Sequence, residues 1–316
     1  DGIRDDLVTG VQTCALPILK VQKPGVETIL YTDLNVVHWA TKLLEKAVPK
    51  IKFASLSEIV DEIKTRMVRE VDFIEEAQNL DDFVQYLNVS GNQAATAPKV
   101  YHQFSTRRVL TMQRLYGVSL TDFDVVKKYA KDPTQVLITA MNTWFGSLML
   151  CKSFHADLHA GNLMLLEDGR IGFIDFGIVG QLKPEVWTAC MAFMDALQHT
   201  NYTAMAENML KMGMTHQKID TQVLADDLER LFSGVLLADP QEILTSNPAD
   251  LNDIMMDMIG VGERHGIKFP RDFALLFKQM LYFDRFMRVL APYTDIYADQ
   301  RLKMVHNIEP ASFLKH

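Results

Sequence analysis

The chain has 316 residues, 48% of them hydrophobic, which is enough apolar material for a sizeable core in one or two domains. A formal net charge of −8, without a basic stripe, argues against a nucleic-acid-binding protein. The three cysteines, at positions 14, 151 and 190, lie too far apart for a disulfide framework or a metal-binding spacing. The longest apolar run, residues 136–150, is too short to cross a bilayer. We therefore expect no transmembrane helix, and peripheral contact with a membrane stays open.

Residues 1–18 differ in character from the rest of the chain. They show no periodicity, and the segment 8–18 resembles the translation of a sequencing-library adapter read in frame into a gene fragment. We expect this segment to be non-native and to take no part in the fold. On this interpretation the native N-terminus, with any targeting peptide, lies upstream of Leu19 and is missing.

The first half of the remaining chain mixes short strands with helices. Ser55 and Glu58 form a capping-box pattern at the start of a long amphipathic helix. The predicted elements are, in order, a strand at 19–22, a helix over 33–48, the long helix over 55–87, strands at 100–101 and 109–112, and a buried helix over 134–150.

The second half opens with a hairpin and continues as helices. Two apolar strands, 163–166 and 171–174, are joined through Asp168-Gly169, a dipeptide favoured in hairpin turns. From Pro184 the periodicity is helical throughout. The predicted helices cover about 184–198, 202–213, 221–238, 250–265 and 270–291.

The most informative stretch is His-Ala-Asp-Leu-His-Ala-Gly-Asn at 155–162, followed by Asp-Phe-Gly at 175–177. The order and spacing of these two motifs are typical of kinase-like folds, which bring a catalytic acid and metal ligands to the phosphates of ATP. We expect Asp157 to orient or deprotonate the acceptor, and Asn162 and Asp175 to ligate Mg²⁺. His155 is expected to be a buried histidine that braces the catalytic loop.

A metal-dependent hydrolase is a minor alternative for the same stretch. His155, Asp157 and His159 alternate, so in an extended segment they would share one face and could bind a transition metal. This alternative leaves Asp175 and Asn162 without a role, and no second histidine cluster supplies the remaining ligands.

Lys20 lies in the middle of a predicted strand, where an unpaired charge would be costly. A strand lysine that is paired to a helix glutamate and directed at the α- and β-phosphates resolves that cost. Asp72, Glu76 and Asn79 share one face of the 55–87 helix by their spacing. A solvated polar stripe would show the same spacing, and Glu75 stays a competing partner.

Met112, Gln113 and Arg114 end the strand at 109–112 and precede Gly117. A hinge that offers its backbone to an adenine would lie at this place. An ordinary edge strand and turn would show the same residues.

Four segments together resemble one family, the UbiB/ADCK (AarF-like) atypical kinase-like proteins. They are Lys-Val-Gln-Lys-Pro-Gly-Val at 20–26, Glu-Val-Asp-Phe-Ile-Glu-Glu-Ala-Gln-Asn at 70–79, the 155–162 motif, and Phe-Ile-Asp-Phe-Gly-Ile-Val-Gly at 173–180. The tail segment 268–279 also resembles the family. The layout and the resemblance imply an α+β, two-lobed protein-kinase-like fold. Its incomplete small lobe would span 19–118, and its helix-rich large lobe, with the catalytic loop and C-terminal helices, would span 119–316.

The resemblance also implies roles by position. Lys20 resembles the strand lysine of the family and Glu76 its helix glutamate, which favours Glu76 over Glu75 as the partner. Glu70 and Asp72 match the E-x-D pair of the family. On a continuous helix these two carboxylates would face different sides, so the helix must be distorted there or they must serve different partners.

The sequence also departs from the family pattern. Gln113 stands where a hinge glutamate is common, and Leu158 and Ala160 replace frequent prolines. The alanine-rich nucleotide loop and the K-x-G-Q helix should lie upstream of Lys20, where the adapter-like segment stands. The chain as written is therefore expected to bind nucleotide poorly and to be inactive itself.

The resemblance implies an atypical kinase or ATPase that uses ATP and Mg²⁺ and supports isoprenoid quinone (ubiquinone or plastoquinone-type) biosynthesis or lipid metabolism. A quinone precursor or another lipid would be its partner, with peripheral membrane contact and no nucleic acid. An ordinary protein kinase is disfavoured, because only seven positions separate Gly177 from Pro184 and leave no room for a long activation segment. A non-catalytic nucleotide- or lipid-binding regulator (a pseudokinase) is the alternative. The resemblance favours the bacterial cytoplasm or inner-membrane periphery, and a mitochondrion or plastid is compatible with it.

Overall fold

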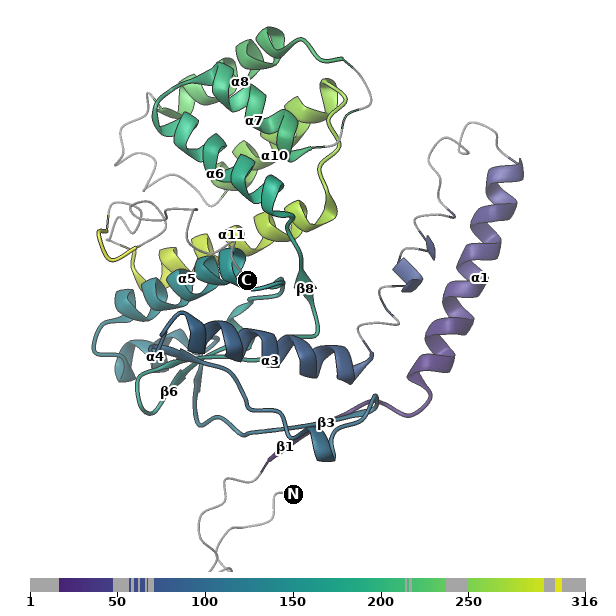
Figure 1. The fold of residues 1–316 in the computed structure, drawn as a ribbon, viewed down its shortest axis with the longest axis vertical. Helices are drawn as coiled ribbons and strands as arrows, with labels where there is room; N and C mark the ends of the chain where they lie inside the picture. Colours follow the sequence, from purple (N-terminus) through teal and green to yellow (C-terminus); the bar gives the residue numbers. More distant parts are fainter. Residues whose placement is uncertain are drawn as a thin grey trace, which may run out of the picture. The chain divides into compact units, whose positions relative to one another are not determined.

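A computed structural model describes residues 17–47, 71–213, 218–236, 249–292 and 299–302, together with residues 57, 60, 61, 63–65, 67 and 215. The predicted capping box at residues 55 and 58 and the predicted site residue Glu70 lie outside these described residues. The chain divides into two compact units (Figure 1). The first comprises residues 1–84, 97–116 and 175–177, and the second comprises residues 85–96, 117–174 and 178–316.

The first unit is built on a two-stranded antiparallel sheet. Strand β1 (Ile18–Val21) pairs with β3 (Val109–Met112), and the register sets Lys20 opposite Leu110. Leu110 is fully buried, so this pairing anchors the strand that carries the lysine. The short helix η2 (His102–Phe104) lies before β3 in the chain.

Helix α1 (Val26–Ala47) begins earlier than the predicted start at residue 33. The turn at Lys23-Pro24-Gly25 leads directly into it, because Val26 N–H donates to Lys23 O at 3.1 Å and Ile29 N–H donates to Gly25 O at 3.0 Å. Gly25 has a φ of 79°, a left-handed conformation that favours glycine. The helix therefore starts at this turn.

The predicted continuous helix over 55–87 is wrong at its centre. Helix α3 (Phe73–Val89) begins after a turn at Val71, and Asp72 precedes its first residue. The Asp72 carboxylate accepts from Ile74 N–H at 3.0 Å, and the Asp72 carbonyl accepts from Glu75 N–H at 3.1 Å. A short acidic side chain that binds free backbone N–H groups starts a helix rather than continuing one.

The second unit contains a four-stranded sheet in the order β2-β7-β6-β4. The predicted hairpin forms its centre, with β6 (Leu163–Leu166) antiparallel to β7 (Ile171–Phe173), and Gly169 in the turn has a φ of 86°. Strands β2 (Ala95–Thr96) and β4 (Gly117–Ser119) pair with the two outer sides of the hairpin. A separate pair, β5 (Phe154–His155) and β8 (Val179–Gly180), flanks the catalytic motifs in the chain.

Helices make up the rest of the second unit, and the predicted tail helices are found within a few residues of their expected ends. Short α4 was not predicted. Figure 1 shows α6, α7, α8 and α10 gathered in one group and α5 beside α11. The helices are α4 (Phe123–Tyr129), α5 (Pro133–Leu150), α6 (Pro184–Gln198), α7 (Tyr202–Met212), α8 (Thr221–Leu236), α10 (Ala249–Arg264) and α11 (Arg271–Leu290), with the short helix η3 (Ala160–Asn162).

An aromatic cluster joins α5, α11 and β5 in the core of the second unit. The ring of Trp144 lies 5.3 Å from that of Phe283 and 6.1 Å from that of Phe154, measured between centroids. Trp144 is fully buried, as predicted for a core residue, and its Nε1–H donates to His155 O at 2.9 Å. The core of this unit therefore holds the strand that leads into the catalytic motif.

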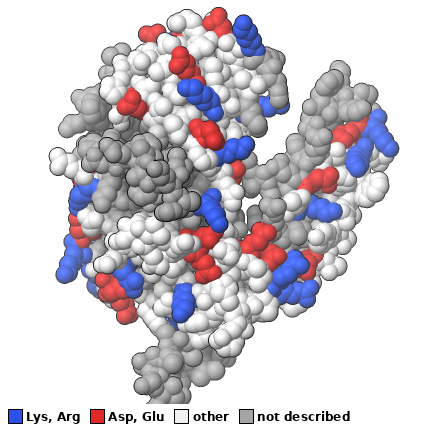
Figure 2. All heavy atoms as spheres, viewed as in Figure 1, with Lys and Arg blue, Asp and Glu red and all other residues white. Residues whose placement is uncertain are grey.

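Among the described helices, none combines the length and the apolar character that crossing a bilayer needs. On the face shown in Figure 2, the lysine and arginine side chains of the described residues are interspersed with aspartate and glutamate.

Candidate functional site

The catalytic motif begins at β5 and turns through η3 into β6. His155 is 1% exposed, and its Nε2 donates to Ile174 O at 3.0 Å while its Nδ1 accepts from Asp157 N–H at 3.1 Å. The imidazole thus links the catalytic loop to the strand that precedes Asp175, which is the bracing position that we expected for it.

Both ring nitrogens of His155 are occupied by these two hydrogen bonds. A histidine can ligate a transition metal only through a nitrogen with a free lone pair. The metal-hydrolase alternative, which needs His155 beside Asp157 and His159 as a ligand, therefore does not fit the structure.

Asp157 and Asn162 come together although five positions separate them. The Asn162 side-chain nitrogen donates to Asp157 O at 2.9 Å, and Asn162 N–H donates to His159 O at 2.9 Å in the first turn of η3. Asn162 is buried, and its carbonyl accepts from Ile174 N–H at 3.0 Å. Because the amide nitrogen makes the bond to the loop, the amide oxygen is the atom that can ligate a cation.

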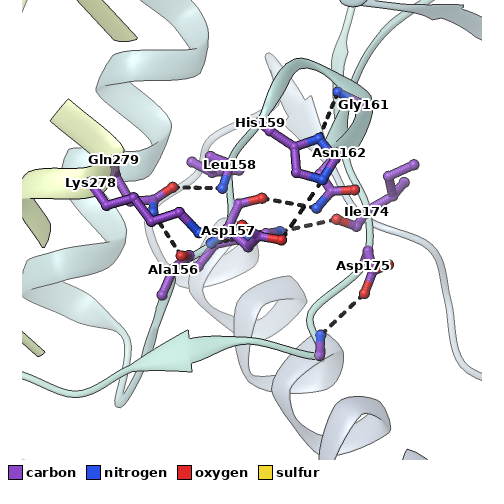
Figure 3. Close-up of polar contacts among 12 residues, drawn as sticks. Ala156, Asp157, Leu158, His159, Gly161, Asn162, Ile174, Asp175, Lys278 and Gln279 are labelled. Carbon is purple, nitrogen blue, oxygen red and sulfur yellow. Dashed lines mark hydrogen bonds and ion pairs between the residues drawn. The ribbon is translucent and has the colours of Figure 1, made fainter. Parts of the chain in front are cut away.

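Two residues of α11 also contact this loop, and sequence reasoning missed both (Figure 3). The Gln279 side chain bonds the backbone at Ala156 and Leu158, and Lys278 Nζ lies 2.7 Å from Asp157 Oδ1. A signal was present in the sequence, because Gln279 falls on the apolar stripe of α11, three residues after the buried Leu276 and four before the buried Phe283. A glutamine on such a stripe needs buried partners.

The first unit contains the predicted lysine cluster. Lys20 Nζ lies 2.8 Å and 2.9 Å from the two carboxylate oxygens of Glu76 and 2.9 Å from Asp175 Oδ1. Glu76 is 3% exposed, whereas Lys20 is 33% exposed. The structure thus selects Glu76 rather than Glu75 as the partner of Lys20.

Burial and attraction oppose each other in this cluster. Burial disfavours the charged ammonium of Lys20, but the attraction of Glu76 and the hydrogen bonds to Glu76 and Asp175 outweigh it and raise the pKa of Lys20. Burial raises the pKa of Glu76, and the attraction of Lys20 works against that increase. The bidentate contact to an ammonium favours the ionised carboxylate, so we assign the pair as charged at neutral pH.

The Asp-Phe-Gly segment is held by α3. Phe176 is buried and its ring lies 4.9 Å from that of Phe83, while its carbonyl accepts from the Asn79 side chain at 3.1 Å. Asp175 has a φ of 61°, in the left-handed region that is uncommon for residues other than glycine. Such conformations are concentrated at functional sites, where surrounding contacts maintain them.

The remaining predicted residues lie apart from the lysine cluster. Asp72 pairs with Arg107, whose Nε lies 3.0 Å from Asp72 Oδ2, and the expectation that Asp72 lies within the helix is wrong because α3 begins at Phe73. Met112 is buried at the end of β3, and Gln113 N–H donates to Lys99 O at 2.8 Å. Arg114 stacks on Tyr116, with 5.2 Å from its guanidinium carbon to the ring centroid.

Asp175 in the first unit and Asn162 in the second each offer an oxygen ligand. Carboxylate oxygens from Asp175 and an amide oxygen from Asn162 are hard ligands of the type that Mg²⁺ prefers. A lysine held by a buried glutamate, a D-F-G aspartate and an H-x-D-x-x-x-x-N loop on a mixed α+β frame define the class of kinase-like proteins.

Comparisons with known proteins place the chain within that class. Residues 12–209 match the profile of the ABC1 atypical kinase-like domain, and the chain belongs to this family, which includes the aarF and UbiB/ADCK proteins. The resemblance seen in the sequence is therefore confirmed.

Relatives of the chain occur in plants and bacteria. The chain is 44% identical over 308 residues to an uncharacterized chloroplastic aarF domain-containing protein kinase of Arabidopsis thaliana. The match covers 92% of this chain and 57% of that protein. It is 30% identical over 289 residues to an uncharacterized protein of Mycobacterium tuberculosis, covering 90% of this chain and 57% of that protein. The chain thus spans 57% of the length of these curated relatives.

A solved structure shares the fold. The complex of Rv3197 with erythromycin, from Mycobacterium tuberculosis, matches with a TM-score of 0.54 and 22% sequence identity, and the match covers 87% of this chain and 71% of that one. This likeness confirms the kinase-like fold class that the sequence predicted.

Proposed function

We propose that this chain carries the catalytic residues of an atypical kinase or ATPase that transfers a phosphoryl group from ATP with Mg²⁺. The observation that carries the proposal is the Lys20–Glu76–Asp175 cluster, with Lys20 Nζ within 2.9 Å of both carboxylates. A lysine fixed by a buried glutamate can place its ammonium against the phosphates of ATP. Asp175 stays half exposed to solvent, so this carboxylate is accessible to a ligand.

Each residue has a proposed role. Lys20 orients the α- and β-phosphates, and Glu76 holds Lys20 in place. Asp157 orients the hydroxyl of the acceptor or water and accepts its proton, while Asn162 and Asp175 would each offer an oxygen to a cation. Bound Mg²⁺ would neutralise charge on the phosphate oxygens. Met112, Gln113 and Arg114 form the proposed adenine-binding hinge, although Gln113 N–H is already used by Lys99 O.

The acceptor that we propose is water or a small molecule, with a precursor of an isoprenoid quinone or another lipid as the substrate class. The segment after Asp-Phe-Gly supports this proposal, because it pairs at once as β8 with β5 and enters α6 at Pro184. A peptide substrate has no long activation segment here on which to dock. Identity to the chloroplastic relative supports a location in a plastid.

A non-catalytic regulator that binds nucleotide or lipid is the second candidate. The contact between Lys20 and Asp175 favours it, because the ammonium occupies one oxygen of the carboxylate that a metal needs. Asp157→Asn distinguishes the two functions, since only a catalyst needs this carboxylate.

The test measures ATP turnover and MgATP binding in parallel. It uses the chain as printed and the protein encoded by the full reading frame of the source locus, which also shows whether residues 1–18 are native. For a catalyst, Asp157→Asn should lower turnover by roughly 100- to 10,000-fold and retain MgATP binding. Asp175→Asn should weaken Mg²⁺-dependent binding.

Asp195→Asn is the matched control, because Asp195 is an exposed carboxylate on α6. It should leave both quantities unchanged. If the wild type binds MgATP without turning it over, and Asp157→Asn does not change that binding, the regulator is established. Failure of the locus-encoded protein to bind MgATP by calorimetry would reject the catalyst and the nucleotide-binding form of the regulator.

A further inference from the structure

Helix α11 brings two adjacent polar side chains to the catalytic loop, 121 residues away in the chain. Figure 3 shows Lys278 and Gln279 side by side, with Lys278 reaching Asp157 and Gln279 reaching Ala156 and Leu158. The motifs at 155–162 and 175–177 do not include either residue.

Gln279 brackets the backbone of Asp157. Its Nε2 donates to Ala156 O at 2.6 Å, and its Oε1 accepts from Leu158 N–H at 2.6 Å. The side chain is fully buried. An amide is the side-chain group that offers a donor and an acceptor at this separation, so the two peptide groups that flank Asp157 are fixed by one residue.

Lys278 holds the carboxylate itself. Its Nζ lies 2.7 Å from Asp157 Oδ1 and 5.6 Å from the centroid of the Tyr282 ring. The lysine side chain is 42% exposed and the aspartate side chain 23% exposed. A pair this open to solvent contributes little to folding stability, so stability does not explain why a cation lies on this particular carboxylate.

The second carboxylate oxygen faces His159. The His159 Nδ1 accepts from Gly161 N–H at 3.0 Å, so in the neutral imidazole Nε2 carries the proton. That Nε2 lies 3.8 Å from Asp157 Oδ2, beyond hydrogen-bonding distance. Lys278 therefore fixes one oxygen and leaves Oδ2 as the atom that can accept a proton from a bound hydroxyl.

We propose that Lys278 and Gln279 are positioning residues for phosphoryl transfer, with Gln279 setting the backbone of Asp157 and Lys278 setting the direction of its carboxylate. This inference rests on the proposed function of Asp157. It predicts that helix α11 contributes to the chemical step while contributing little to the binding of MgATP.

The test compares Lys278→Met, Lys278→Arg and Gln279→Met with Arg285→Met, in the protein that turns over ATP. Arg285 is an exposed cation on the same helix and touches no motif residue in the contacts that the structure describes. We expect Lys278→Met to lower kcat by roughly 10- to 100-fold, because the carboxylate loses its fixed direction. The KM for MgATP and the Tm of Lys278→Met should stay at the values of the control. Lys278→Arg should retain most of the wild-type kcat.

Gln279→Met keeps the length of the side chain but removes both hydrogen bonds. Hydrogen exchange at the Leu158 amide should become more than about tenfold faster than in Arg285→Met, since its acceptor is gone. A Lys278→Met variant with wild-type kcat, or one that changes only KM or Tm, would overturn the role of Lys278. Unchanged exchange at Leu158 would overturn that of Gln279.

Failure of the proposed catalytic function and failure of the positioning roles of Lys278 and Gln279 give different results. If the wild-type protein binds MgATP but has no turnover, the catalytic function fails, and so does the kinetic role of Lys278. The exchange measurement still decides whether Gln279 fixes the loop. If the wild type turns over ATP and the Lys278 variants are unaffected, only the further inference fails.

Discussion

At the scale of single residues, the negative charge of the buried Glu76 carboxylate is compensated by the ammonium of Lys20. Glu76 is almost inaccessible, and Lys20 reaches it from β1 with two hydrogen bonds. Removal of the cation alone leaves a buried carboxylate without compensation, which costs more than removal of both partners. The pair therefore makes stability and the proposed binding of phosphate depend on the same atoms.

We expect Lys20→Met to reduce the free energy of unfolding by about 1–3 kcal/mol, discounted for the partial exposure of the lysine. The double variant Lys20→Met/Glu76→Gln should recover most of that loss, because the amide carries no charge to bury. Urea denaturation of the wild type, the single variants and the double variant gives the coupling. Strictly additive effects would contradict an ionised pair.

His155 offers a second test at this scale. His155→Leu keeps the apolar volume but removes the bonds to Ile174 O and Asp157 N–H, so two partly buried backbone groups lose their partners. We expect a loss of about 2–4 kcal/mol in the free energy of unfolding. The exposed His199, changed to leucine, serves as the control in the same thermal-unfolding measurement and should show a shift close to zero.

The sequence predicted these residues to different degrees. Lys20, Glu76, His155 and Asn162 could be proposed because short motifs carry them, and the structure places Lys20 with Glu76 and His155 with the loop. Lys278 and Gln279 could not be assigned, since their partner is distant in the chain and no local pattern names it. Asp72 was misplaced because helical spacing was extended across its own cap.

At the scale of elements, α3 and α5 meet at a glycine. A Cβ built on Gly146 of α5 would overlap the hydroxyl of Tyr86 of α3, and that hydroxyl donates to Thr143 O at 2.8 Å. Small residues at such a point allow two helices to approach closely. The glycine is therefore required by packing, although it lowers helix propensity.

Gly146→Ala should destabilise the protein by about 1–3 kcal/mol, even though alanine is the better helix former. In a Tyr86→Phe background the oxygen is absent, and the cost of the same substitution should fall below about 1 kcal/mol. Chemical denaturation of the four proteins in this cycle gives the answer. An equal cost in both backgrounds would show that Tyr86 is not the obstacle.

Elements with strong local periodicity were predicted well from the sequence, and those that depend on distant pairing were not. The hairpin β6–β7 and the tail helices need only turn chemistry and a 3.6-residue period. Strands β2, β5 and β8 have two residues each and exist because remote segments pair with them. Their pairing has no signature in the local sequence.

At the scale of the whole molecule, the second unit contains a tyrosine hydroxyl and a cysteine thiol whose pKa values are raised by burial. Burial raises the pKa of Tyr86 to about 12 and that of Cys190 to about 12. Both groups ionise at lower pH in the unfolded chain, so the stability they contribute is complete below pH 9.0 and is lost as the pH rises towards 12.

We therefore expect the free energy of unfolding to fall by several kcal/mol between about pH 9 and pH 12. The variant Tyr86→Phe/Cys190→Ala should lose less over this range, measured as the difference from its own value at pH 8. Urea titrations at each pH provide the measurement. Parallel curves for the two proteins would show that other groups control the alkaline transition.

The contact from Gln279 to the loop has a consequence for synthesis. When the ribosome has translated as far as residue 265, every motif residue is present in the nascent chain, but the side chain that fixes Ala156 and Leu158 is not. The catalytic loop can adopt its final geometry only after α11 has emerged from the exit tunnel. A protein interrupted before this helix would contain the motifs at 155–162 and 175–177 and still lack the side chain that bonds Ala156 and Leu158.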